Sequence, residues 1–281
     1  MLVRQPIINP RMFALDLDGT LLNSEKFLTE GVLNALEEIS KNDIRIAFAS
    51  GRIESSMKRY VQLCSFPVSL LSLNGAVVCM DAQHGSRRVY GAALPAEYAD
   101  FLLNHAEKQG IAANYYIDNN LYSIRTEKNK PWLDLYYQQT QSYYNYIPSF
   151  NGFRGRSPDK IIFIGPSELL DEQQKHFVNL WGESVYICRT WDFYLEFLNP
   201  LANKGDGMAA LASSYGIAAE DVVAFGDASN DVPMLRMAGL GIAVRNASAD
   251  AKLAAKYVSS WSNDEDAVAR EWGVMSSRVV G

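Results

Sequence analysis

The stretch FALDLDGTLL at residues 13–22 decides the fold, because a short apolar run stops there on two carboxylates and a glycine. The run predicts a buried strand that ends in a charged loop. Residues i and i+2 of an extended segment point to the same side, so Asp16 and Asp18 are expected to project together, with Cα atoms roughly 6–7 Å apart. Two such carboxylates repel each other unless a cation or a proton lies between them, and Mg²⁺ is the usual partner of hard oxygen ligands. The pair predicts a metal site, a shared proton, or both; the alternative is a solvated Asp-rich turn.

The composition is that of a folded protein with two domains. At 281 residues the chain is long for one hydrophobic core, and 48% of its residues are hydrophobic. It has no run of about 18 apolar residues and no apolar segment typical of a secretory signal near its start, so no membrane partner is expected. Three widely spaced cysteines, an odd number, favour a reducing cytoplasm without disulfides. The net charge of -6 disfavours nucleic acid as a partner.

Apolar runs that end on polar residues recur along the chain. A helical pattern over 29–40 leads to a second apolar run at 44–49, which stops at Ser50-Gly51-Arg52. The order strand, helix, strand is typical of a parallel α/β sheet whose site lies beyond the carboxyl ends of the strands. Asn74-Gly75, between the apolar runs 68–73 and 76–80, predicts a hairpin that adds an antiparallel ribbon.

The middle of the chain has a different texture. Residues 85–196 are rich in Tyr, Trp, Asn and Gln, and extended segments joined by turns alternate with helical patterns, which predicts an inserted α+β module. The parallel-sheet pattern returns afterwards, with helices over 203–215, 230–237, 247–257 and 264–272 and strands over 222–225 and 240–244. The expected architecture is α/β, with a Rossmann-like, mostly parallel sheet core at 1–84 and 197–281 and an inserted cap at 85–196.

The stretch Asp16-Leu17-Asp18-Gly19-Thr20-Leu21-Leu22 resembles the first motif of the haloacid dehalogenase (HAD) superfamily, whose members are mostly phosphohydrolases. Segments that resemble the other three motifs follow in order: Ala49-Ser50-Gly51-Arg52, Lys204-Gly205, and Gly226-Asp227-Ala228-Ser229-Asn230-Asp231. Each is weak alone, but four in order, three of them at the ends of apolar strands, are a strong signal. An EF-hand is excluded for both acidic loops, because neither has Gly at position 6 or Glu at position 12.

The resemblance implies a role for each motif residue. Asp16 is the nucleophile that forms an aspartyl phosphate, and Asp18 protonates the leaving oxygen and later deprotonates water. Mg²⁺ is bound by the Asp16 side chain, the Asp227 side chain and the backbone carbonyl of Asp18. For Asp231 we favour a role in which it holds water on the ion, with direct binding as the alternative. The phosphate is bound by the Ser50 hydroxyl, the Lys204 cation, Asn230 and the backbone N–H groups of Leu17 and Gly51. Helix capping is the alternative role for Asp227 and Asp231.

Three features resemble the Cof-type phosphatases with a type-two α/β cap. They are the size of the insertion and the segments Leu73-Asn74-Gly75-Ala76 and Gly241-Ile242-Ala243-Val244. Arg245 and Ala267 depart from this pattern, since Gly is frequent at the first position and usual at the second. In the cap we expect packing roles for Tyr136, Tyr137, Tyr143, Tyr144 and Tyr146, with stacking on a substrate ring as the alternative. For Arg154, Arg156 and Lys160 a solvated loop is favoured over contact with a substrate anion.

Together these features predict a cytoplasmic, Mg²⁺-dependent phosphatase that hydrolyses a small phosphorylated metabolite, such as a sugar phosphate or a phosphorylated cofactor, as a monomer or small homo-oligomer. A phosphomutase with the same core chemistry is the nearest alternative. A binding protein that keeps the fold without turnover is an alternative of another class.

Overall fold

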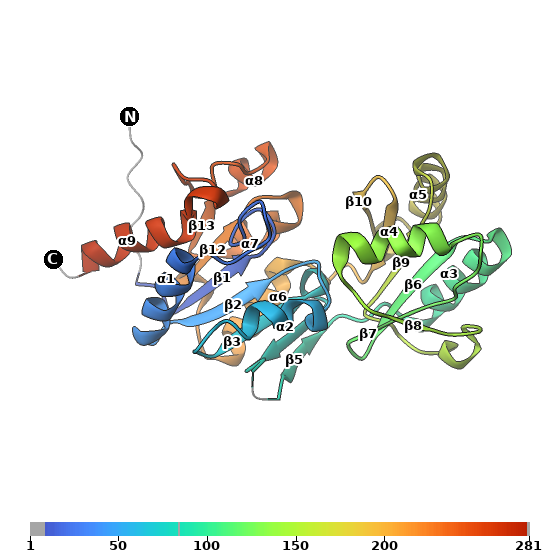
Figure 1. Cartoon of the computed structure of the whole chain (residues 1–281), viewed down its shortest axis with the longest axis horizontal. Coiled ribbons are helices and arrows are strands. Elements are labelled where there is room, and N and C mark those ends of the chain that lie inside the picture. The colour runs from blue at the N-terminus through green and yellow to red at the C-terminus, as the bar shows by residue number, and fades with distance from the viewer. Residues whose placement is uncertain (1–8, 84, 280–281) are drawn as a thin grey trace. The chain divides into compact units, whose positions relative to one another are not determined.

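The computed structural model describes residues 9–83 and 85–279, and these form two compact units. The first unit takes its described residues from 1–51, 57–90 and 203–281, and the second takes them from 52–56 and 91–202. Each unit is built around its own sheet (Figure 1). Among the described residues, no helix is long and apolar enough to cross a membrane.

The sheet of the first unit has eight strands in the order β14-β13-β12-β1-β2-β3-β4-β5. Neighbouring strands from β14 to β3 run parallel, and β3 and β4 pair antiparallel through the hairpin predicted at Asn74-Gly75. The fold is therefore the expected α/β type with a mostly parallel core. Its strands are β1 (Met12–Asp16), β2 (Arg45–Ala49), β3 (Val68–Ser72), β4 (Val77–Met80), β5 (Arg87–Gly91), β12 (Val222–Gly226), β13 (Leu240–Ala243) and β14 (Tyr257–Val258).

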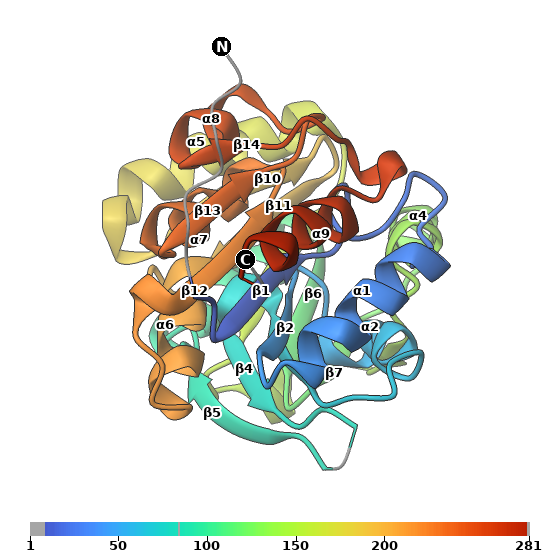
Figure 2. The same ribbon diagram turned by 90° about the vertical axis from the view of Figure 1, so that its left-hand side faces the viewer.

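The chain reverses its winding between the two central strands. From β1 it proceeds to β2 on one side, and from β12 it proceeds to β13 on the other, although β1 and β12 are direct neighbours. Connections that leave in opposite directions open a crevice at the carboxyl ends of such strands. Figure 2 shows α1 and α9 to one side of these strands and α6 and α7 to the other. The helices of this unit are α1 (Glu30–Lys41), α2 (Glu54–Val61), α6 (Lys204–Ser214), α7 (Val232–Met237), α8 (Ala249–Ala254) and α9 (Ala267–Val279).

Local sequence explains where these helices begin. The side chains of Thr29, Asn203 and Ser248 accept hydrogen bonds from backbone N–H groups in the first turns of α1, α6 and α8. The last helix starts later than the predicted 264, because Asp266 adopts φ 56° and separates α9 from the short 3₁₀ turn Asn263–Glu265. The buried face of α1 carries the apolar residues expected from the helical pattern, Val32, Leu36 and Ile39 among them.

The second unit is an α+β module with a six-stranded sheet in the order β10-β11-β9-β6-β7-β8. Side chains alternate across this sheet: Tyr115 packs in the apolar cluster with α3 and α5, whereas the next residue, Tyr116, hydrogen bonds Tyr136 of α4. The segment 87–91, which we expected in the insert, instead forms β5 at the edge of the first sheet. The elements of the second unit are α3 (Ala96–Gln109), β6 (Ala112–Ile117), β7 (Asn120–Ser123), α4 (Lys130–Thr140), β8 (Tyr144–Tyr146), β9 (Lys160–Ile164), α5 (Ser167–Trp181), β10 (Tyr186–Trp191) and β11 (Tyr194–Leu198).

Candidate active site

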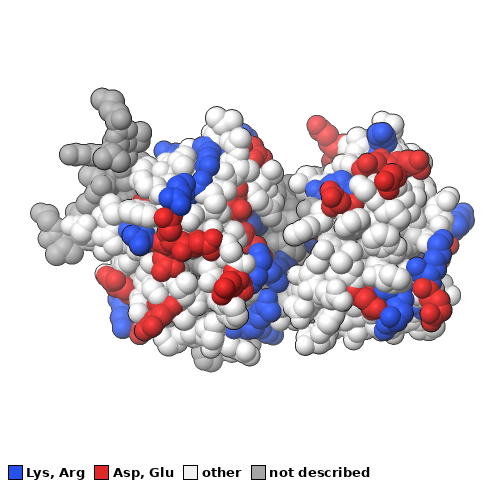
Figure 3. Space-filling view, turned by 45° about the horizontal axis from the view of Figure 1, so that its top comes forward, with Lys and Arg blue, Asp and Glu red and all other residues white. Residues whose placement is uncertain are grey.

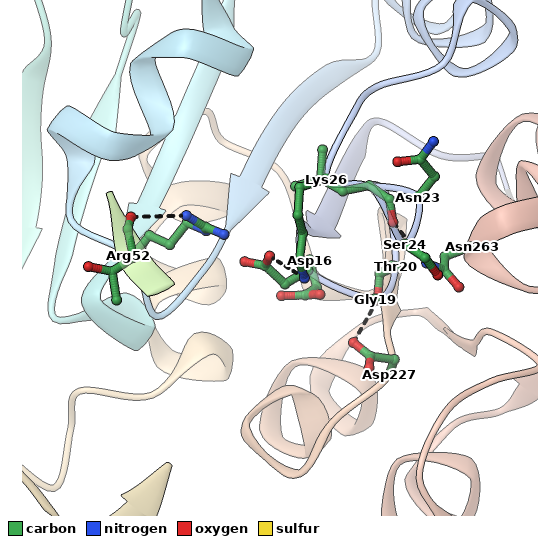
Figure 4. Close-up of polar contacts among 12 residues, drawn as sticks. Asp16, Gly19, Thr20, Asn23, Ser24, Lys26, Arg52, Asp227 and Asn263 are labelled. Carbon is green, nitrogen blue, oxygen red and sulfur yellow. Dashed lines mark hydrogen bonds and ion pairs between the residues drawn. The ribbon is translucent and has the colours of Figure 1, made fainter. Parts of the chain in front are cut away.

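Three acidic side chains meet where β1 and β12 end. Asp16 is the last residue of β1, and Asp227 and Asp231 follow β12. Since these strands are parallel neighbours, their carboxyl ends lie at the same edge of the sheet. One carboxylate oxygen from each residue lies within 4.8 Å of the others, and Figure 4 shows Asp227 below the loop that follows Asp16. The edge of the sheet at which the winding predicts a crevice is thus acidic.

Lys204 places a cation among these carboxylates. It is the first residue of α6 and is fully buried, and its Nζ donates to Asp16 Oδ1 at 2.6 Å and to Asp231 Oδ1 at 2.5 Å. Burial alone would lower the pKa of Lys204, but the charges of Asp16 and Asp231 outweigh it and hold this pKa above its usual value. The ammonium group therefore remains charged at any physiological pH.

Close packing of the backbone brings Lys204 to this position. Gly75 has φ +86°, and a Cβ on it would lie 2.4 Å from the carbonyl oxygen of Asn203. A Cβ on Gly205 would lie 2.8 Å from the backbone of Pro233. Only glycine permits both approaches, so the β3–β4 hairpin and the start of α7 fix the first turn of α6. The Asn-Gly pair that predicted a hairpin thus also positions the cation.

Asp16 has one carboxylate oxygen without a hydrogen-bond partner among the described residues. The residue is 5% exposed, and its buried Oδ2 has no hydrogen-bond partner among the described residues. Burial, followed by the charge of Asp231, raises the pKa of Asp16 well above its usual value even though Lys204 acts in the opposite sense; burial and Asp231 also raise the pKa of Asp227. A buried, unpartnered carboxylate oxygen among like charges fits a hard divalent cation.

Both carboxylate oxygens of Asp231 accept hydrogen bonds from the protein. Its Oδ1 accepts from Lys204, and its Oδ2 accepts from the backbone N–H groups of Asp227 and Ala228 at 2.9 and 3.0 Å. Both carboxylate oxygens of Asp231 therefore have protein partners, and the favoured role, in which Asp231 holds water on the ion, stays a prediction. These hydrogen bonds include the capping bonds that were the alternative role for this residue.

The loop after Asp16 closes against Asp227. Thr20 Oγ1 donates to Asp227 Oδ1 at 3.1 Å, which Figure 4 shows as a dashed line. Gly19 has φ +84°, and a Cβ on it would lie 2.5 Å from Asp227 Oδ2. Leu17, between the two aspartates, is fully buried. Sequence reasoning gave Thr20 no role, although its place in the first motif was the available signal.

The second motif meets the fourth through Asn74. Ser50 directly follows β2 and is almost fully buried, and its carbonyl accepts from the backbone N–H of Asn74 at 2.9 Å. The Asn74 side chain accepts from Asn230 Nδ2 at 3.0 Å, and a Cβ on Gly51 would lie 3.2 Å from the same oxygen. The sequence analysis used Asn74 as a turn signal and as part of a Cof-type segment, but it missed the link that Asn74 makes between Ser50 and Asn230.

Asp18 is on the solvent side of this group. Its carboxylate forms an ion pair with Lys26 Nζ at 2.9 Å, and the side chains are 32% and 52% exposed respectively. Lys26 has φ 66° in the loop that leads to α1. A backbone in the left-handed region is rare for lysine, and no sequence pattern indicated this pair.

The second unit corrects one expectation. Lys160 is not in a solvated loop: it is a buried residue of β9 that pairs with Glu196 at 3.1 Å. Arg154 and Arg156 do form ion pairs that water reaches, with Glu107 and Asp118. The tyrosines divide: Tyr136 is buried against the Tyr144 and Tyr194 rings, whereas Tyr143 is 79% exposed.

The raised pKa values of Asp16 and Asp227 lead to a prediction for metal binding. In the metal-free protein these carboxyl groups retain protons above the usual range, and a bound cation must displace them. We expect Mg²⁺ affinity to fall as pH is lowered, by at most about tenfold per pH unit for each proton displaced. Titration calorimetry at about pH 5.5 and about pH 7.5, in buffers of different ionisation enthalpy, measures both affinity and proton release. Equal affinity at the two pH values without proton release would contradict it.

Comparison with known proteins identifies the family. The family model described as haloacid dehalogenase-like hydrolase matches residues 13–271. The HMP-PP phosphatase of Yersinia enterocolitica is 30% identical over 238 residues, which are 84% of each chain. A haloacid dehalogenase-like hydrolase from Bacteroides thetaiotaomicron superposes with a TM-score of 0.85 at 24% identity, over 95% of this chain and 99% of that one. A sugar phosphatase of HAD subclass IIB gives a TM-score of 0.77 at 22% identity, over 95% and 99% of the two chains.

The chain therefore belongs to the haloacid dehalogenase-like hydrolase family. It is an enzyme of the phosphoric monoester hydrolase class, and the resemblance to Cof-type members with a type-two cap is confirmed.

Proposed function

We propose that this enzyme is a Mg²⁺-dependent phosphatase that hydrolyses a small phosphorylated metabolite through an aspartyl phosphate on Asp16. The observation that carries the proposal is the buried contact of Lys204 with Asp16 beside the unpartnered Asp16 Oδ2. A cation at 2.6 Å offsets the charge that a carboxylate nucleophile and a phosphate bring together. The three free cysteines Cys64, Cys79 and Cys188 are compatible with the proposed cytoplasmic location.

In the first half-reaction the Asp16 carboxylate attacks phosphorus and the bond to the leaving oxygen breaks, while Asp18 gives that oxygen a proton. In the second half-reaction Asp18 takes a proton from water, whose oxygen attacks the aspartyl phosphate, and Asp16 is regenerated as inorganic phosphate leaves. Ser50, Lys204, Asn230 and the backbone N–H groups of Leu17 and Gly51 are the proposed phosphate contacts.

The donor set of the acidic group fits Mg²⁺, since its three side chains, Asp16, Asp227 and Asp231, all offer carboxylate oxygens. We propose that the Asp16 and Asp227 side chains and the backbone carbonyl of Asp18 bind the ion. Asp231 orients these groups through its hydrogen bonds with Lys204 and the backbone N–H of Asp227. When bound, Mg²⁺ supplies positive charge that stabilises the phosphate oxygens in the transition state.

A small substrate is supported by similarity and by charge. The Yersinia enterocolitica relative carries the name HMP-PP phosphatase, and a sugar phosphate or a phosphorylated cofactor is the substrate class that we propose here. The face drawn in Figure 3 carries charges of both signs on each unit, and the net charge of the chain is -6. A large nucleic acid partner would require a continuous basic surface.

The test is a release assay for inorganic phosphate over a library of phosphorylated metabolites, with p-nitrophenyl phosphate as a generic ester. We expect turnover with Mg²⁺, loss of turnover with a chelator, and recovery when Mg²⁺ is returned. A strict requirement for a bisphosphate activator would instead favour the phosphomutase. A non-catalytic binding protein would release no phosphate and bind no metal-fluoride mimic of the phosphoryl group.

A further inference from the structure

A turn near the C-terminus holds the loop that carries Asp18. The loop comprises residues 17–29, and the turn comprises residues 262–266, about 240 positions later in the sequence. Asp264 accepts two hydrogen bonds from Ser24, from its backbone N at 2.7 Å and from its Oγ at 2.6 Å. The buried side chain of Asn263 donates to the carbonyl of Leu22 at 3.0 Å. Figure 4 shows Asn263 beside Ser24 at the outer end of this loop.

Further contacts extend this attachment at both ends of the loop. Asn246 Nδ2 donates to the carbonyl of Gly19 at 2.8 Å, and Asn246 Oδ1 accepts from the backbone N–H of Asn263 at 3.0 Å. At the other end Thr29 Oγ1 donates to Asp266 Oδ1 at 2.8 Å. The turn and its neighbour Asn246 thus contact residues 19, 22, 24 and 29, so the loop is held along most of its length.

The held segment leads directly back to Asp18. Residues 23–27 close on themselves, since the backbone N–H of Asn23 donates to the carbonyl of Phe27 and the Asn23 side chain accepts from the backbone N–H of Phe27. Lys26, within this closed segment, donates from Nζ to Asp18 at 2.9 Å. Contacts thus run without a break from Asp264 through Ser24 and the 23–27 segment to Lys26 and the Asp18 carboxylate.

From these contacts we infer that Asp264 and Asn263 are positioning residues that hold Asp18 where it exchanges a proton with the leaving group. The inference rests on the proposed function, since it assigns a task to the same site. Neither residue is among the proposed metal or phosphate contacts. General acid catalysis requires the carboxyl group within hydrogen-bond reach of the leaving oxygen, so a loose loop reduces proton transfer more than phosphate binding.

The test compares Asp264→Ala with the wild-type enzyme on phenyl phosphate and p-nitrophenyl phosphate. Phenol is a poor leaving group with a pKa near that of tyrosine, about 10, whereas nitrophenol is far more acidic and needs less help from an acid. We expect kcat/KM to fall roughly tenfold for phenyl phosphate but only about twofold for p-nitrophenyl phosphate. Asp264→Asn, which retains an acceptor for the Ser24 N–H, should restore most of the loss.

Glu37→Ala is the control, because Glu37 is also an exposed carboxylate, pairs with Lys41 on α1, and contacts no residue of the 17–29 loop in any hydrogen bond or ion pair described. Its kcat/KM should stay within twofold of the wild-type value on both esters. All assays are run well below the melting temperature of each variant. An equal loss on both esters, or Asp264→Asn as impaired as Asp264→Ala, would overturn the positioning role while leaving the proposed function intact. A wild-type enzyme that hydrolyses neither ester nor any library member would overturn both.

Discussion

Replacing Asp16 with asparagine is expected to reduce turnover by at least about 10⁴-fold, because the amide cannot attack phosphorus and no other carboxylate occupies the end of β1. The same change should not destabilise the metal-free protein. Burial and the charge of Asp231 raise the pKa of Asp16 although Lys204 acts in the opposite sense, so folding disfavours the charged form of this side chain relative to the unfolded chain. Asparagine is neutral and has nearly the same shape.

The stability of Asp16→Asn relative to wild type should change with pH in a defined direction. Between the usual carboxyl pKa and the raised pKa of Asp16, the folded protein binds more protons at this site than the unfolded chain does. The contribution of Asp16 to the free energy of unfolding therefore falls as pH rises through that window. Asp16→Asn lacks this contribution, so its melting temperature relative to wild type should be higher at neutral pH than near pH 4.

The loss of turnover is measured by phosphate release with Mg²⁺, and the change in melting temperature by thermal unfolding with a chelator, each at several pH values. Glu37→Gln is a suitable control, since it alters an exposed carboxylate on α1 that pairs only with Lys41 in the ion pairs described. Near-normal turnover in Asp16→Asn would rule out the proposed mechanism. A melting temperature of Asp16→Asn below that of wild type at neutral pH would show that the bond to Lys204 outweighs the repulsion.

The position of the acidic group could be predicted from the sequence for a physical reason. Apolar runs that stop on Asp16 and Asp227 are parallel strands, and parallel neighbours present their carboxyl ends at one edge. The sequence order of the motifs does not by itself show that β1 and β12 are adjacent, but the return of the same pattern after residue 197 indicated one sheet. The hairpin at Asn74-Gly75 was accessible because its conformation is a local property of that dipeptide.

Contacts between distant segments were not accessible in this way. Three such contacts depend on tertiary placement. They are the bond of Lys204 to Asp231, the contacts of Asn74 with Ser50 and Asn230, and the hydrogen bonds between the 262–266 turn and the 17–29 loop. The buried pair of Lys160 with Glu196 was missed for the same reason, because lysine is rarely buried and only a partner on a neighbouring strand permits it.

Replacing Lys204 with methionine should have the second large effect, on stability as well as on activity. The change leaves Asp16 and Asp231 buried without their shared cation, which costs about 3–5 kcal/mol of unfolding free energy when one partner of a buried ion pair is removed. Turnover should fall at least about 10³-fold, since the charge that neutralises phosphate and nucleophile is lost. Urea unfolding with a chelator present measures the first effect without compensation by a bound metal.

The double variant Lys204→Met with Asp231→Asn separates the two effects. Asparagine at 231 can still accept the backbone N–H groups of Asp227 and Ala228 but brings no charge. It should restore about 1–3 kcal/mol of stability, because it removes a repulsion between Asp231 and Asp16 that the lysine no longer offsets, and it should restore none of the activity. If activity returned together with stability, Lys204 would be a structural residue whose loss acts through unfolding. If neither single nor double variant lost stability, the buried ammonium would contribute no net stabilisation to the acidic group, and the charge balance argued for this site would be wrong.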